Sequence, residues 1–400
     1  MGVRLFAGLI AAGLVLVACV GGEDSGDATT SSLAATTTTT KAGSSTTTTT
    51  TTLVAVTPVV DEAFLAEQAA NVSIPGSGGA FMVAVIDADG EVVYTARGTD
   101  PDGNPLTPDA ALRVGSITKV FTSLVTLTLV DEGLVDLDAL ALDYVTRVPV
   151  PDGVLVRDLL QHTSGIPEHV DRPGFFDMLH DDQRRVWSPE EAVDLIAGIE
   201  PLFAPGAEWS YSNTNYLILG VLIEEVTGRP FHEVLRARIL DPLGLESTYL
   251  PGFEDGPAPF GAYTSLFGST EPLDFDYTSI ATIAWAAGSV VSSAKDLHLL
   301  FTAMFDGTLI SADSLAEIVG TPTALPREQA AFLPFEYGLG IEVWDDPEGL
   351  SGHGGGIPGY TTQVLHDSDT GTTAFWVVTA DDMDLSSAVR GVAERIAGTR

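Results

Sequence analysis

The chain has 400 residues, a formal net charge of −37, and 45% hydrophobic residues. A surface this acidic would repel nucleic acid and anionic membranes, so we expect neither as a partner. The only cysteine is Cys19, which excludes an intramolecular disulfide.

The first 58 residues are predicted to lie outside the folded domain. Arg4 and an apolar run over residues 5–18 indicate a signal peptide (1–19), because the run is too short for a stable membrane span. The run ends directly before Cys19 and resembles the bacterial lipobox, which implies export, lipidation of Cys19 and anchoring on the outer face of the cytoplasmic membrane. An ordinary secretory signal and an uncleaved anchor are the alternatives. Residues 20–58 are rich in threonine and predict a disordered linker.

The folded domain is predicted over residues 59–398. Residues 81–87 and 91–96 predict a β-hairpin, and residues 117–130 predict a helix that is buried nearly all round. Strands are then expected only near the end of the chain, over 338–343, 361–366 and 373–378. This order predicts an α+β fold, in which an antiparallel sheet built from both chain ends is flanked by helices and carries an inserted, mainly helical lobe. The other expected helices are 61–71, 156–161, 188–199, 214–226, 230–239, 294–305 and 385–397, and residues 251–280 are expected to be rich in loops.

Ser116 and Lys119 stand at the start of the buried helix, three residues apart and therefore on one face. A serine hydroxyl becomes a good nucleophile when a base removes its proton. Burial and the positive end of the helix dipole both lower the pKa of a lysine, so Lys119 can be that base. Taken alone, such a pair more often marks an ordinary helix start with a lysine that reaches back to solvent, so the catalytic interpretation needs partners elsewhere in the chain.

A second group of polar residues lies between a Pro-Gly turn and the helix at 214. Tyr211 and Asn213 are two residues apart, and in a loop they can face the same way. A tyrosine beside a lysine can relay a proton to a leaving group, and an asparagine amide can bind a substrate amide. The neighbouring Trp209 is interpreted as a packing residue, and His162, which follows the helix 156–161, as a structural turn residue.

The third group is the glycine-rich segment 351–359, expected just before a strand. His353 supplies a polar or positive group, and the glycines can leave backbone N–H groups free to bind an oxyanion. The segment also matches a dinucleotide-binding pattern by letter, but Pro358 and the strand expected after it do not fit that fold. A lipase-type oxyanion motif is excluded because the segment follows Ser116 by more than 200 residues.

Together the three motifs resemble those of the serine beta-lactamase and penicillin-binding protein superfamily, and most of all secreted D-alanyl-D-alanine carboxypeptidases and beta-lactamase-related serine hydrolases. The resemblance implies that Ser116 is acylated, Lys119 is the base for acylation, Tyr211 shuttles the proton and His353 tunes the proton network. It implies no metal and no cofactor. The implied substrate contacts are Asn213, Gly354 and Gly355, and the implied oxyanion hole is formed by the backbone N–H groups of Ser116 and Gly356.

The leading expectation is therefore an acyl-enzyme serine hydrolase with D-alanyl-D-alanine carboxypeptidase-like action on peptidoglycan stem peptides. Beta-lactams would be its inhibitors, and the lipid anchor its only membrane contact. Gly354 stands where carboxypeptidases usually have threonine, and residues 341–344 lack the arginine that often assists in binding the terminal carboxylate. These departures favour an esterase or D-amino-acid amidase or aminopeptidase acting on other small acyl substrates. A non-catalytic wall-binding or sensor lipoprotein is a third alternative, but it would need no activated serine.

Overall fold

The structure is a computed structural model that describes residues 60–70, 72–74, 78–266, 271–273, 277–320, 323, 326, 335–381 and 383–398. The predicted signal peptide, Cys19 and the linker lie outside these residues. Within the described ranges, no helix is long and apolar enough to cross a membrane.

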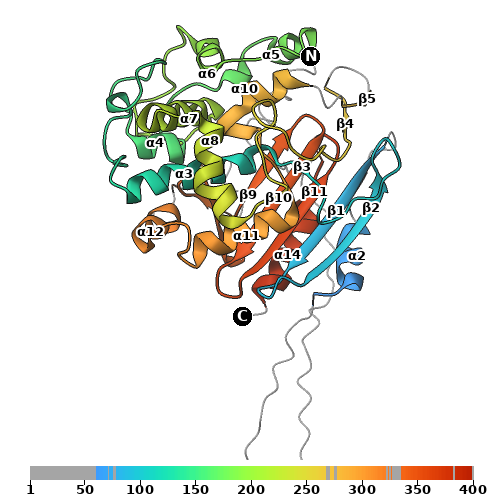
Figure 1. Ribbon diagram of the computed structural model, residues 1–400. Coiled ribbons are helices and arrows are strands. Elements are labelled where there is room, and N and C mark those ends of the chain that lie inside the picture. The colour runs from blue at the N-terminus through green and yellow to red at the C-terminus, as the bar shows by residue number, and fades with distance from the viewer. Residues whose placement is uncertain are drawn as a thin grey trace, which may run out of the picture.

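A seven-stranded antiparallel sheet, in the order β2-β1-β11-β10-β9-β8-β7, joins the two ends of the folded region (Figure 1). The first and last parts of the chain meet where β1 pairs with β11, with Phe81 opposite Val378. The predicted α+β architecture is confirmed. The strand bounds are β1 (Gly79–Ile86), β2 (Val92–Thr99), β7 (Phe335–Tyr337), β8 (Glu342–Asp345), β9 (Glu348–Ile357), β10 (Tyr360–Asp367) and β11 (Thr372–Val378).

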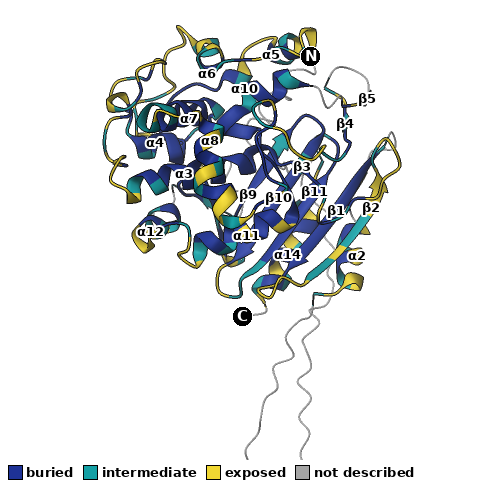
Figure 2. Ribbon diagram, in the orientation of Figure 1, coloured by how far each residue is buried: buried dark blue, intermediate teal, exposed yellow. Residues whose placement is uncertain are grey.

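Both faces of the sheet are covered, as the burial of β1 shows (Figure 2). Side chains alternate along a strand, so Phe81, Val83 and Val85 face one layer and Met82 and Ala84 face the other. The first layer contains α2 (Glu62–Ala70) and α14 (Ser386–Ala397). The second is the larger helical part of the molecule, which includes α11 (Ala294–Phe305).

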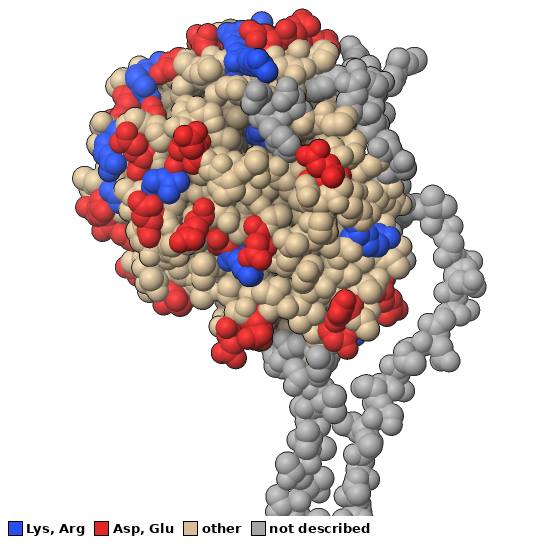
Figure 3. All heavy atoms as spheres, turned by 45° about the vertical axis from the view of Figure 1, so that its right-hand side comes forward, with Lys and Arg blue, Asp and Glu red and all other residues tan. Residues whose placement is uncertain are grey.

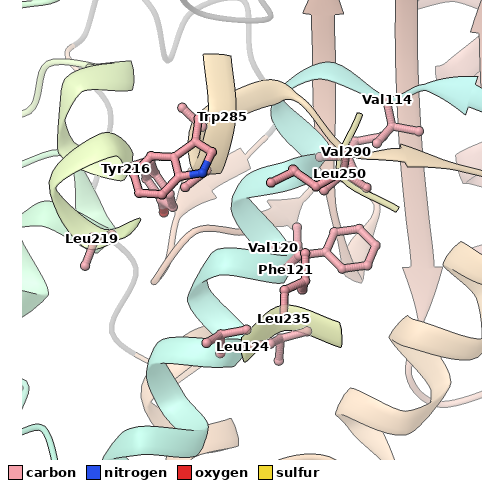
Figure 4. Close-up of a cluster of buried hydrophobic side chains, with 14 of the residues drawn as sticks. Val114, Val120, Phe121, Leu124, Tyr216, Leu219, Leu235, Leu250, Trp285 and Val290 are labelled. Atoms are coloured by element: carbon pink, nitrogen blue, oxygen red, sulfur yellow. The ribbon is translucent and has the colours of Figure 1, made fainter. Parts of the chain in front are cut away.

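Helix α3 (Thr118–Asp131) runs through the helical part, and its residues from Thr118 to Leu127 are all buried. Figure 4 shows Val120, Phe121 and Leu124 of this helix among apolar side chains from several other segments. The other helices are α4 (Val156–Gln161), α5 (Phe175–Asp181), α6 (Pro189–Val193), α7 (Asn213–Thr227), α8 (Phe231–Leu235), α9 (Asp241–Leu243), α10 (Thr278–Gly288) and α12 (Ala312–Gly320), and two short sheets pair β3 (Leu112–Arg113) with β6 (Val291–Ser292) and β4 (Tyr263–Thr264) with β5 (Glu271–Pro272).

Three expectations need correction. The helix expected over 188–199 has the predicted capping box at Ser188, but α6 ends at Val193 and a short 3₁₀ turn follows. Of the strand expected over 338–343, only residues 342 and 343 lie in a strand, β8; residues 338–341 form a turn between β7 and β8, in which Gly340 has a φ of +83°. The glycine-rich segment precedes the strand β10 as expected, but it is not only a connection, because residues 351–357 are themselves part of β9.

The glycines of β9 are required by close backbone approach. A Cβ at Gly352 would lie 1.9 Å from the Val364 carbonyl oxygen, and one at Gly355 would lie 2.1 Å from that of Val114. Glycine has low strand propensity, which is why the pattern of residue types did not reveal this strand. The consequence is that β9 can lie directly against the turn that carries Ser116.

Candidate active site

Ser116 lies in the 3₁₀ turn Gly115–Ile117 that leads into α3. Gly115 has a φ of +54°, and a Cβ there would lie 2.9 Å from the Gly356 nitrogen. Glycine at 115 therefore lets the serine turn approach β9 closely. This places the backbone of Ser116 beside that of Gly356, as the predicted oxyanion hole requires.

Lys119 is completely buried, one turn further along. Its Nζ lies 3.1 Å from the Ser116 Oγ, 2.7 Å from the Asn213 Oδ1 and 2.7 Å from the Ala287 carbonyl oxygen. Burial lowers the pKa of Lys119 well below that of a free lysine. A neutral amine in this position can donate to the two fixed oxygens and accept the proton of the serine hydroxyl.

One of those oxygens comes from a distorted helix. In α10, Trp285 has φ and ψ of 31° and −119°, so the helix is kinked just before its end. Beyond the kink, the Ala287 carbonyl accepts from Lys119, and the Ala286 carbonyl accepts from Thr122 Oγ1 at 2.7 Å. Strained backbone of this kind persists only where its surroundings hold it, and here it ties α10 to α3 at the reacting lysine.

Glu168 is a buried carboxyl that the sequence motifs did not identify. It accepts hydrogen bonds from the backbone N–H groups of Asn213, the first residue of α7, and of Val170 at 2.9 Å. Burial raises the pKa of Glu168, and its negative charge favours the protonated form of Lys119. The only sequence signal was weak: Glu168 is the single carboxyl within residues 159–170.

The Tyr211 ring lies 4.9 Å from the Lys119 Nζ. Its hydroxyl is buried, and no group among the described residues forms a hydrogen bond of normal geometry with it. Burial raises the pKa of Tyr211 well above its usual value, although the nearby Ser116 hydroxyl acts in the opposite direction. The tyrosine therefore stays a neutral O–H donor, which suits protonation of a leaving group.

His353 lies one step away from this centre. Its Nε2 is 2.7 Å from the Tyr337 hydroxyl, and its Nδ1 is hydrogen-bonded to the Gly354 carbonyl oxygen. Burial and then the charge of Lys119 lower the pKa of His353 to about 3. The ring is therefore neutral, which corrects the expectation of a positive group and retains that of a polar one. Its link to Tyr211 passes through Tyr337, whose ring stands edge-on to that of Tyr211 at 6.2 Å.

The two residues interpreted as structural behave as such. His162 has a φ of +64° at the end of α4, and its Nδ1 accepts from the Ser212 N–H at 3.1 Å. Trp209 is almost fully buried against His162, Tyr211 and Tyr337. Both side chains therefore help to hold Tyr211 in position.

A cavity opens beside Ser116, between the serine turn and the helices α5 and α10. Ser116 and Asn213 line one part of it, and most of the remaining wall is apolar. The apolar lining includes Val170, Phe175, Phe176, Leu179, Ile280, Ile283, Ile357 and Pro358. The site can thus hold a carbonyl at the serine while an apolar group enters this cavity.

Gly354 and Gly355 are the remaining predicted substrate contacts, and their surroundings differ. The Gly354 N–H is not free, because it donates to the Glu342 carboxylate at 2.7 Å. Gly355 lies over the Val114 carbonyl and the Thr362 hydroxyl. Substrate binding by these two glycines stays a prediction. Among the described residues, no group of three or more His, Cys, Asp or Glu side chains is placed to hold a metal ion.

Residues 63–398 match the beta-lactamase family. The chain belongs to this family. In this beta-lactamase-related chain, the serine turn, the tyrosine loop and β9 come from three distant parts of the sequence and converge on one cavity. The superfamily and the fold that the motifs indicated are therefore confirmed.

Similar proteins include a penicillin-binding protein and a D-aminopeptidase. The chain is 25% identical over 307 residues to a penicillin-binding protein of Bacillus subtilis, covering 73% of this chain and 66% of that protein. It is 30% identical over 303 residues to a D-aminopeptidase of Brucella anthropi, covering 74% of this chain and 54% of that enzyme. The chain thus spans about two thirds of the first relative and about half of the second.

Two solved structures of similar fold have names that refer to D-amino acids or to D-stereospecific action. The D-stereospecific amidohydrolase of a Streptomyces species is 30% identical with a TM-score of 0.72, over 85% of this chain and 100% of that one. The D-amino acid amidase of Ochrobactrum anthropi, solved in complex with D-phenylalanine, is 26% identical with a TM-score of 0.68, over 84% of this chain and 97% of that one. These relatives favour serine hydrolase chemistry, with D-amino-acid amides better represented than carboxypeptidase substrates.

Proposed function

We propose that this protein is a D-stereospecific amide hydrolase that works through an acyl-enzyme on Ser116. Its substrates would be amides or short peptides of D-amino acids with apolar side chains. The observation that carries the proposal is the contact between Lys119 Nζ and Ser116 Oγ at the mouth of an apolar cavity.

The geometry supports the following sequence of acylation steps. Neutral Lys119 takes the hydroxyl proton as Ser116 Oγ attacks the substrate carbonyl, and the resulting oxyanion lies between the N–H groups of Ser116 and Gly356. Tyr211 donates a proton to the departing nitrogen, and the Lys119 ammonium restores that proton to Tyr211. The C–N bond breaks, the amine leaves and an ester on Ser116 remains. Water then hydrolyses the ester and returns the free serine.

Two observations favour this function over the D-alanyl-D-alanine carboxypeptidase alternative. The cavity beside Ser116 is lined by two phenylalanines and several aliphatic side chains, which a methyl side chain would fill poorly. Two similar proteins act on D-amino acids by name: an amidase and an aminopeptidase. Peptidoglycan stem peptides remain a second proposed substrate class. Beta-lactams remain proposed inhibitors that acylate the serine.

The proposed cellular place follows from the N-terminal residues. Export and lipid anchoring at Cys19 would put the hydrolase outside the cytoplasmic membrane, where D-amino-acid peptides derived from the cell wall are available. Labelling with a radioactive fatty acid, compared between the natural chain and Cys19→Ser, tests this placement.

The activity itself is tested by comparing amides that differ in one feature. We expect kcat/KM for D-phenylalaninamide to exceed that for D-alaninamide by at least about tenfold, since burial of the phenyl group contributes about 1.4 kcal/mol or more. The same margin is expected over L-phenylalaninamide, because the opposite configuration would not place the ring in the cavity while the carbonyl lies at Ser116. Ser116→Ala should abolish all three activities. Faster turnover of N-acylated D-alanyl-D-alanine peptides than of D-phenylalaninamide would favour the carboxypeptidase alternative instead.

A further inference from the structure

Glu342, the first residue of β8, is a buried carboxyl close to the catalytic groups. It accepts three hydrogen bonds: from the Gly354 N–H at 2.7 Å, from Gln363 Nε2 at 2.9 Å and from Trp344 Nε1 at 3.3 Å. Within the described part of the chain, no lysine, arginine or histidine forms an ion pair with it. Burial raises the pKa of Glu342, and the three hydrogen bonds act in the opposite direction by favouring its charged form. The field of the buried carboxylate reaches its surroundings with little screening by water.

The position of Glu342 relative to β9 is set by strand register. Glu342 pairs with Gly352, and β8 begins there, so residues 353–357 of β9 have β10 on one side and, among the described residues, no strand partner on the other. The Gly354 N–H points to this open edge, because it donates to Glu342. Alternate N–H groups of a strand point the same way, so the Gly356 N–H faces the same edge. The Glu342 carboxylate is therefore about 7 Å along the strand from the predicted oxyanion donor.

The two ends of the open edge differ in chemistry. Beyond Gly356 lies the apolar cavity, which Ile357 and Pro358 help to line. Toward Gly354 lie Glu342 and the Tyr337 hydroxyl that is bonded to His353. The negative charge of Glu342 also contributes to the raised pKa of Tyr211, which places it within electrostatic reach of the group that would protonate the leaving nitrogen. An acyl side chain thus belongs at the apolar end, and the leaving group belongs at the Glu342 end.

We propose that Glu342 is a specificity-determining residue that disfavours leaving groups carrying a carboxylate next to the scissile amide. This inference rests on the proposed function and concerns the other side of the scissile bond. A C-terminal residue with a free carboxylate would bring a second negative charge to the end of β9 where Glu342 already lies. A leaving group without that charge, such as ammonia or the amino group of an amidated residue, meets no such repulsion.

The test uses two substrates that differ only in this charge, D-phenylalanyl-D-alanine and D-phenylalanyl-D-alaninamide. The natural protein should show at least about tenfold higher kcat/KM for the amide. Glu342→Gln should reduce that ratio several-fold toward one, because the glutamine oxygen can still accept from Gly354 but carries no charge. Glu348→Gln, an exposed position on β9 at the far end of the strand, is the matched control and should keep the natural ratio.

A pH series on the natural protein gives the same answer without any substitution. Ionisations common to both substrates cancel in the ratio, and above about pH 5 the substrate carboxylate stays charged. In that range, protonation of Glu342 should appear as a ratio that falls as the pH is lowered. Equal turnover of the two compounds, or an unchanged ratio both in Glu342→Gln and across pH, would overturn the inference alone. No turnover of either compound would contradict the proposed function and the inference with it.

Discussion

At the scale of single residues, the chemistry depends on charges that the protein keeps out of water. Lys119 is a useful base only because burial lowers its pKa, and the two oxygens that hold it come from Asn213 and Ala287. Glu168 acts against that effect: it holds the Asn213 backbone, while its charge favours protonated Lys119. We therefore regard Glu168 as a positioning residue that also sets the pH range of the base.

This role predicts a shift in a pH profile. The acid limb of kcat/KM reports the loss of a proton from Lys119, because only the neutral amine can activate Ser116. Removing the negative charge in Glu168→Gln lowers the pKa of Lys119, so the limb should move to lower pH, while the glutamine oxygen still accepts from Asn213. Glu67→Gln, on the exposed side of α2, serves as the control. A variant with lower activity at every pH and an unmoved limb would show that Glu168 is only structural.

At the scale of helices and strands, the predictions succeeded where a local pattern was strong. The helices α4 and α11 have the predicted bounds, because a regular apolar pattern and clear end signals mark them. Strand β9 was missed because its glycines are required by tertiary contacts, whereas glycine has a low strand propensity. Helix α10 was not predicted: its first three residues lie in the segment expected to be rich in loops, and no element was expected over the rest. Glu168 and Glu342 were missed because only folding brings them near Lys119 and Gly354.

The packing of α7 on α10 gives a prediction about one glycine. A Cβ at Gly220 would lie 2.6 Å from the Trp285 ring and 2.8 Å from the Ala286 Cβ, next to the kink that directs the Ala287 carbonyl at Lys119. Alanine normally favours a helix by about 1 kcal/mol relative to glycine. Here Gly220→Ala should instead lower the free energy of unfolding by about 1–3 kcal/mol, as overpacking does.

Urea denaturation measures this effect, and Gly391→Ala in α14 is the matched control. A Cβ at 391 would meet the mobile end of the Gln68 side chain, which can move aside, so this change should be neutral or stabilising. Equal stability of the two variants would contradict the tight packing of α7 against α10.

At the scale of the whole molecule, the site lies where the two structural parts meet. The sheet contributes β9, and the helical part contributes α3, α7 and α10, so each motif is far from the others in sequence and close in space. The sequence predicted this convergence through the resemblance of three motifs, whereas the apolar cavity and the identity of its walls required the fold. Figure 3 shows one face of the molecule, on which acidic side chains are spread among a smaller number of basic ones, in line with the acidic composition of the chain.

The central claim is that Ser116 forms an acyl-enzyme, and mass spectrometry of the protein and of its peptides tests it most directly. Residues 60–400 are incubated with benzylpenicillin or with the p-nitrophenyl ester of D-phenylalanine, beside Ser116→Ala, quenched in acid and digested. The account predicts a mass increase equal to the acyl group, located on the peptide that contains Ser116 and absent from the variant. Turnover of the ester with acyl label on another residue, or an equal adduct in Ser116→Ala, would contradict it.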